Sequence, residues 1–137
     1  MRRIVETLDI QTAMAPASVN ASTDTTSGYV DASGAEEVDF IISTAALGAG
    51  KALTVTLMGA NDGEGDGAAA IGDAVTFTDA VGTEPQAAVV SYRVDPQKAR
   101  YLAVEFQHDG AAAVICSVAA LRKGAYRPAQ NPWTALM

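Results

Sequence analysis

The sequence predicts an all-β fold, an antiparallel β-sandwich or barrel with an arm at each end. Two observations lead to this fold class. Between residues 28 and 121, segments that alternate apolar and polar residues recur about every dozen positions, and a period of two is typical of strands with one buried face. Clusters of Gly, Asp, Asn and Pro, such as Gly48-Ala49-Gly50 and Asp95-Pro96, separate these segments, as they do in all-β domains.

Length and composition indicate one domain. A chain of 137 residues buries roughly two thirds of its unfolded surface in a single core. Hydrophobic residues make up 49% of the sequence but aromatic residues only 6%, so we expect a core of Val, Leu and Ile with few large rings. Such a modest core gains stability from oligomerisation.

The first segment, residues 1–27, is rich in Ala, Ser and Thr. We expect a short helix over residues 4–14 and an extended N-terminal arm over the remainder.

The body is predicted to span residues 28–121. Five strands are expected from period-two alternation or apolar content, over residues 29–31, 37–43, 52–58, 74–78 and 88–94. Two more strands, over residues 98–107 and 111–121, flank Asp109-Gly110, which is the turn signal of a β-hairpin. The segment 59–73 lacks strand character and is expected to be an exposed loop. The expected inward side chains are Val38, Phe40, Ile42, Leu53, Val55, Leu57, Val75, Phe77, Val90, Tyr92, Val94, Leu102, Val104 and Phe106.

The C-terminal tail, residues 122–137, contains two prolines and the only tryptophan of the chain. Exposed apolar groups favour association, so we expect this tail to be held either along its own body or on a neighbouring subunit.

The net charge of -7 argues against binding to nucleic acid, because such binding depends on basic side chains. Residues 28–121 hold thirteen acidic and four basic side chains, whereas residues 122–137 hold three basic and no acidic ones. An acidic body and a basic tail favour contacts with different surfaces, although the acidity also serves solubility alone.

No catalytic, cofactor-binding or metal-binding residue is predicted. His108 stands beside Asp109 without a nucleophile in any recognised motif, and we expect it to be an exposed turn residue. Cys116 lies in an apolar run and is expected to be a buried, inert thiol, which leaves no disulfide within the chain. The acidic loop at residues 61–67 lacks the later glutamate of a calcium-binding EF-hand, and we expect a flexible loop, with a weak cation site as the alternative.

No segment has the length and apolarity of a transmembrane helix, and the acidic residues Glu6 and Asp9 interrupt any secretion signal. We therefore expect a soluble protein that is synthesised in a cytoplasm, without a membrane partner.

Several short motifs, in their order along the chain, resemble those of the cement or head-decoration proteins of tailed bacteriophages. They are Gly28-Tyr29-Val30-Asp31, Glu37-Val38-Asp39-Phe40-Ile41-Ile42, Leu53-Thr54-Val55-Thr56-Leu57, the acidic loop Asn61-Asp62-Gly63-Glu64, Lys98-Ala99-Arg100-Tyr101-Leu102-Ala103-Val104, and the exit Leu121-Arg122-Lys123-Gly124 with Arg127-Pro128. The chain departs from the family pattern where Ala99 splits the Lys-Arg pair and where the acidic loop is richer in glycine.

The resemblance implies a jelly-roll-like sandwich without catalysis, which binds the outside of the capsid as a homodimer or homotrimer. Its partner is then the phage major capsid protein, and its place is the capsid exterior. Aromatic and arginine side chains commonly anchor interfaces. On that basis the candidate contact residues are Ile4, Val5, Leu8, Arg100, Tyr101, Tyr126, Arg127, Trp133, Leu136 and Met137. The alternatives are another virion component, such as a head-tail connector or tail tube protein, and a carbohydrate-binding module.

Overall fold

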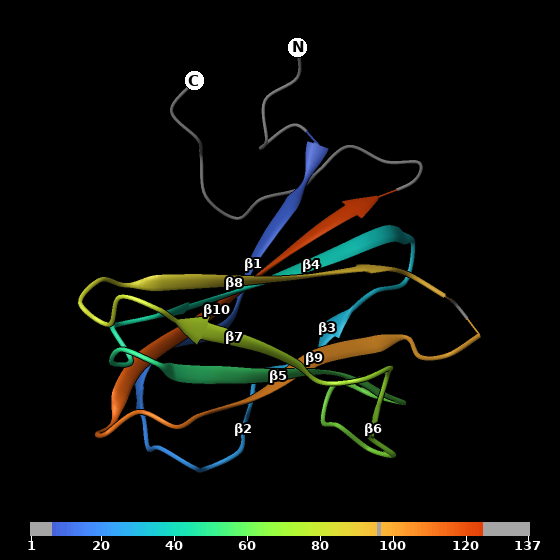
Figure 1. Ribbon diagram of the computed structural model, residues 1–137. Helices are drawn as coiled ribbons and strands as arrows, with labels where there is room; N and C mark the ends of the chain where they lie inside the picture. The colour runs from blue at the N-terminus through green and yellow to red at the C-terminus, as the bar shows by residue number, and fades with distance from the viewer. Residues whose placement is uncertain (1–6, 96, 125–137) are drawn as a thin grey trace.

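The computed structural model describes residues 7–95 and 97–124 of the chain, and these form two antiparallel β-sheets that face each other (Figure 1). The predicted all-β sandwich is confirmed. Its strands are β1 (Asp9–Val19), β2 (Thr25–Thr26), β3 (Val30–Asp31), β4 (Ala35–Thr44), β5 (Lys51–Ala60), β6 (Ala69–Ala70), β7 (Val75–Asp79), β8 (Gln86–Arg93), β9 (Tyr101–His108) and β10 (Val114–Gly124). In the described part of the chain, no helix is long and apolar enough to cross a bilayer.

The strand order is that of a jelly roll. Sheet A has the order β1-β10-β4-β8, and sheet B has β2 and β3 on β9, then β5, then β6 and β7. Since β2 with β3, and β6 with β7, each act as one interrupted strand, both sheets are four strands wide. The first strand pairs with the last. Successive long strands alternate between the two sheets, except that β5 is followed by β6 and β7 in the same sheet. This order is the double Greek-key arrangement of jelly rolls.

The core lies between the two sheets and consists of the inward side chains of the alternating apolar and polar strands. The inner positions of β4, β5 and β9 are each at most 7% exposed, as predicted: Val38, Phe40, Ile42, Leu53, Val55, Leu57, Leu102, Val104 and Phe106. Burying a side chain of this size contributes about 1.5–3 kcal/mol to folding. On the outer strands burial is weaker, and Val75 of β7 is 50% exposed although an inward position was predicted for it.

The prediction for the N-terminal segment is wrong over residues 9–19, which form β1 in place of a helix and an arm. β1 pairs antiparallel with β10 from Asp9 to Val19. Its register shifts between Thr12 and Met14 and again between Met14 and Ala17. Each bulge changes which face a side chain occupies, so the period of two that reveals a strand is lost from the sequence.

The predicted hairpin at Asp109-Gly110 is also wrong, because β9 lies in sheet B and β10 in sheet A. The turn crosses from one sheet to the other. Asp109 Oδ1 accepts a hydrogen bond from the Ala52 amide at 2.7 Å, and the Asp109 amide donates to the Ala52 carbonyl at 3.2 Å. These bonds fix the chain against the start of β5 as it leaves sheet B.

Candidate partner-binding surface

The outward side of sheet A, here named the sheet A face, is a regular surface formed by four strands of the described chain. The paired registers of its four strands place the outward residues in rows. They are Ile10, Thr12 and Ser18 of β1, Glu37, Asp39, Ile41 and Ser43 of β4, Ala87, Val89, Ser91 and Arg93 of β8, and Ile115, Ser117, Ala119, Leu121 and Lys123 of β10.

Charge on the sheet A face is confined to the end at which β10 finishes. Arg93, Glu37 and Lys123 form one row across β8, β4 and β10, and Asp39 stands in the next row. The rows beyond these hold only Ala, Val, Ile, Ser and Thr, with Val89 53% and Ile115 52% exposed. The central area of protein interfaces is depleted of charged residues, so this face has the composition of a binding surface.

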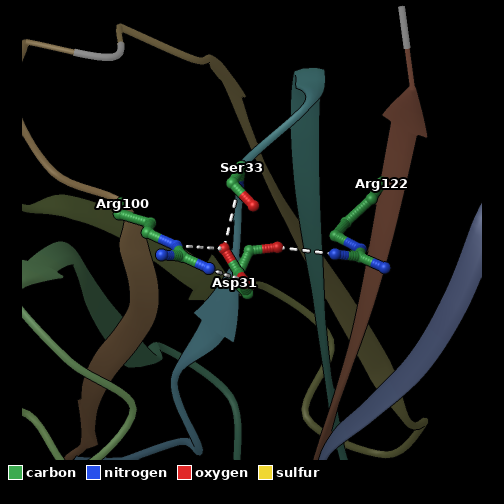
Figure 2. A network of polar contacts seen from close by, with 4 residues as sticks. All are labelled: Asp31, Ser33, Arg100 and Arg122. Carbon is green, nitrogen blue, oxygen red and sulfur yellow. Dashed lines mark hydrogen bonds and ion pairs between the residues drawn. The ribbon is translucent and has the colours of Figure 1, made fainter. Parts of the chain in front are cut away.

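A network of polar contacts ties the two sheets together at the same end (Figure 2). Arg122 of β10 donates from Nη1 to the main-chain carbonyl of Asp31 in β3 at 2.6 Å. Its Nη2 lies 3.3 Å from Asp9 Oδ2 of β1, and both side chains of this ion pair are mostly buried. Arg122 therefore joins the first and last strands of sheet A to sheet B beside the point at which residues 125–137 follow.

The Asp31 carboxylate extends this network to the surface of sheet B. It accepts hydrogen bonds from Arg100 Nε at 3.0 Å and Nη2 at 2.9 Å, and from the Ser33 amide at 2.9 Å (Figure 2). The bonds from Arg100 are the main reason that the pKa of Asp31 lies well below its ordinary value, and Asp31 in turn raises the pKa of Arg100. The Arg100 guanidinium also lies 5.2 Å from the centre of the Tyr101 ring.

The structure describes three of the predicted contact residues. Arg100 is exposed and bound to Asp31, Tyr101 is half-buried at the start of β9, and Leu8 is half-buried immediately before β1. Because Asp9 pairs with Arg122, the chain enters β1 and leaves β10 at one end of the sandwich. The other predicted contact residues lie outside the described part of the chain: Ile4, Val5, Tyr126, Arg127, Trp133, Leu136 and Met137.

The acidic loop after β5 is exposed, as predicted, and is folded by its own carboxylate. Asp62 Oδ1 accepts hydrogen bonds from the amides of Glu64 at 2.9 Å and Asp66 at 3.0 Å. Gly65, with φ of 87°, lies against the Tyr29 ring, where a Cβ atom would come within 2.8 Å of the ring. Within residues 7–95 and 97–124, no cluster of three or more His, Cys, Asp and Glu side chains is placed to hold a metal ion.

A hollow of about 320 Å³ lies between this loop and the segment before β9. Its lining includes Gly59, Asn61, Ile71, Lys98 and Ala99, with Lys98 as the charged side chain. A Cβ atom on Gly59 would lie 2.6 Å from the Ala99 Cβ, so the close approach of these segments requires glycine there.

His108 is completely buried, so the prediction of an exposed turn histidine is wrong. Its Nε2 lies 2.8 Å from the carbonyl oxygen of Val19, and its Nδ1 accepts a hydrogen bond from the Gly110 amide at 3.1 Å. Nε2 therefore acts as the donor and Nδ1 as the acceptor, and both nitrogens are engaged within the fold. Its role is to join the end of β1 to the turn that follows β9.

Cys116 is a buried free thiol, as predicted. Burial raises the pKa of this thiol above its ordinary value. Since the thiolate is the reactive form, Cys116 is protected from thiol chemistry in the folded state.

No known protein-family model and no curated protein matches this sequence. Among solved structures, the chain is similar to dimeric latent PorU from Porphyromonas gingivalis, with a TM-score of 0.52, 11% identity and coverage of 87% of this chain and 13% of that one. It is also similar to the enzymatically active domain of tailspike protein 4 from bacteriophage CBA120, with a TM-score of 0.49, 12% identity and coverage of 86% of this chain and 19% of that one. A third similar structure is a chain of the disulfide-linked pili of Bacillus endospore appendages, with a TM-score of 0.41, 13% identity and coverage of 87% of this chain and 89% of that one. The chain thus spans less than a fifth of the first two proteins, and the likeness to PorU shows the fold alone.

No sequence motif singles out the sheet A face. The alternation over residues 88–94 identifies the inward side chains of this strand and says nothing about a role for Val89 and its outward neighbours. The signal was present, because apolar residues occupy both alternate sets of positions in β8, and in β4 Ile41 stands among the inward residues. A strand that is apolar on both faces is buried on one side by the core and is available to a partner on the other.

Proposed function

We propose that this protein is a structural component of a tailed-phage particle, which binds the outside of the shell of major capsid protein and bridges neighbouring subunits. The observation that carries the proposal is the sheet A face, a low-charge surface whose one end adjoins both termini of the sandwich. The order of sequence motifs supports a phage capsid as the partner. A folded body whose first and last strands begin and end together beside such a face can contact several subunits at once.

Binding of this kind stabilises a shell by mass action. A protein that binds only the assembled lattice shifts the equilibrium towards the assembled state. Contacts repeated at symmetry-related positions add through effective concentration, so weak individual contacts suffice. The network around Arg122 also stabilises a bridging protein. It holds the first and last strands together at the end of the sandwich to which both terminal segments are attached.

The proposal is tested by co-sedimentation of the purified chain with phage shells that lack it. Replacement of the exposed Ile115 by Lys should abolish sedimentation with the shells, because a charge then enters the uncharged rows of the sheet A face. Thr54→Lys, on an exposed position of sheet B, is the matched control and should bind as the wild type does. Equal binding by both variants, or no binding by the wild type, would refute the proposal.

Truncation after Gly124 tests the contribution of the tail separately. The cut is placed there because Arg122 holds β10 to Asp31 and Asp9, so a truncation before that residue removes part of the fold. We expect the truncated protein to keep its melting temperature and to lose most of its shell binding. Unchanged binding would exclude the tail as an anchor.

A further inference from the structure

The free edge of β8 differs from the other sheet edges of the described chain. On the far edge of sheet A, β1 carries two register shifts and Pro16. In sheet B the outer strands are two residues long, except for β7 with five. Bulges, proline and short length are the usual protections against edge-to-edge pairing. β8, by contrast, keeps an unbroken register with β4 over eight residues and contains no proline or lysine.

The register shows which backbone groups of β8 point to this edge. The Val94 amide donates to the Glu36 carbonyl at 2.9 Å, so this opposed pair is a hydrogen-bonded one. Such pairs alternate along antiparallel strands, and therefore Ala88, Val90 and Tyr92 bond to β4. The N–H and C=O groups of the residues between them, Ala87, Val89 and Ser91, point away from β4 and receive no ladder partner from the described strands.

Apolar surface accompanies these backbone groups. Val89 on β8, Val75 on β7 and Val81 in the connection between them are 50–65% exposed. A cavity of about 160 Å³ opens between β7 and β8, lined by core residues such as Leu53, Ala88 and half-buried Phe77. Thr44, which is 4% exposed, also lines this cavity, and its hydroxyl has no hydrogen-bond partner. The two sheets are thus incompletely closed on this side.

We propose that β8 pairs antiparallel with β8 of a second copy of this chain, about a two-fold axis at Val89, so that sheet A continues across two molecules. Val89 then faces its own counterpart, and Ala87 exchanges hydrogen bonds with Ser91 of the other copy. Paired residues in a sheet share a face, and this register keeps outward residues with outward ones. Exposed Arg93 falls opposite Pro85 of the other copy, which is next in the chain to exposed Glu84, so opposite charges approach each other at both ends of the pairing.

The test is the molar mass of the full chain, measured by light scattering on a sizing column over a range of concentrations. We expect a dimer for the wild type and a monomer for Val89→Pro, because proline removes an amide that points to the free edge and none that bonds to β4. Val89→Thr keeps the amide and the β-branched shape, and this matched control should remain a dimer. The circular dichroism of each variant reports whether the fold is retained.

A charge exchange tests the register without altering the backbone of β8. Glu84→Arg should weaken the dimer, because two arginines then face each other at each end of the pairing. The double variant Glu84→Arg with Arg93→Glu should restore it. A monomeric wild type, a trimer or larger ring, a dimer that survives Val89→Pro, or a charge exchange that does not restore the dimer would each overturn the proposal.

Discussion

Replacement of His108 by Ala should destabilise the protein strongly, because the buried ring joins the end of β1 to the turn that follows β9. The side chain is 0% exposed, donates from Nε2 to the Val19 carbonyl at 2.8 Å and accepts from the Gly110 amide at 3.1 Å. In the Ala variant, one buried acceptor and one buried donor lose their partners. Each unsatisfied buried group costs about 1–3 kcal/mol, so the free energy of unfolding should fall by about 2–6 kcal/mol.

The assay is urea unfolding followed by far-ultraviolet circular dichroism, with all variants at one protein concentration. Two partial replacements separate the bonds. The carboxamide nitrogen of His108→Gln can take the place of Nε2 at Val19, and the oxygen of His108→Asn can take the place of Nδ1 at Gly110. Each should recover part of the loss. An Ala variant whose free energy of unfolding lies within about 0.5 kcal/mol of the wild type, or Gln and Asn variants no more stable than Ala, would contradict this role of His108.

Three further predictions concern the polar groups and the thiol. Arg122→Met should lower the free energy of unfolding by about 1–3 kcal/mol, because it removes charge-assisted bonds to Asp31 and Asp9. Arg122→Lys keeps the charge and should lower the free energy of unfolding by less. Equal losses for the two variants in urea unfolding would contradict this prediction. Hydrogen bonds from the Gly82 and Leu47 amides lower the pKa of buried Asp79 below its ordinary value of 3.8. The ionised carboxylate therefore stabilises the fold at any pH above 3.8, and this contribution is lost as the pH falls through the lowered pKa of the folded state. Asp79→Asn should therefore melt at a lower temperature at pH 7 and lose less stability than the wild type on acidification, as scanning calorimetry between pH 7 and 2 would show; parallel curves would contradict it. Cys116 should react slowly with a thiol reagent in buffer and rapidly in urea, and fast reaction of the folded protein would contradict this prediction.

The central strands were predictable from the sequence, whereas the first strand and the crossing between sheets were not. β4 and β9 show an alternation that the core preserves, as in Val38, Phe40 and Ile42. β1 pairs through two bulges, so its side chains follow no fixed period, and its strand conformation is imposed by pairing with β10. A turn signal such as Asp109-Gly110 indicates that the chain reverses, but local sequence does not say whether the next strand returns to the same sheet.

The candidate surface was only partly predictable, for a related reason. Strand alternation identifies which side chains of β8 face inward, and hence which face outward, such as Val89. The alignment of those outward residues with Ile41 and Ala119 depends on strands that are far apart in the sequence. Likewise Arg100 was recognised as an arginine on the surface, but its bonds to Asp31 require the pairing of β3 with β9.

Electron microscopy of phage shells with and without this protein would show directly whether it binds the capsid exterior. We expect additional density on the outside of the shell at sites where neighbouring major capsid subunits meet, with the sheet A face turned towards the shell. Density inside the shell or along the tail, or shells that are identical with and without the protein, would contradict it.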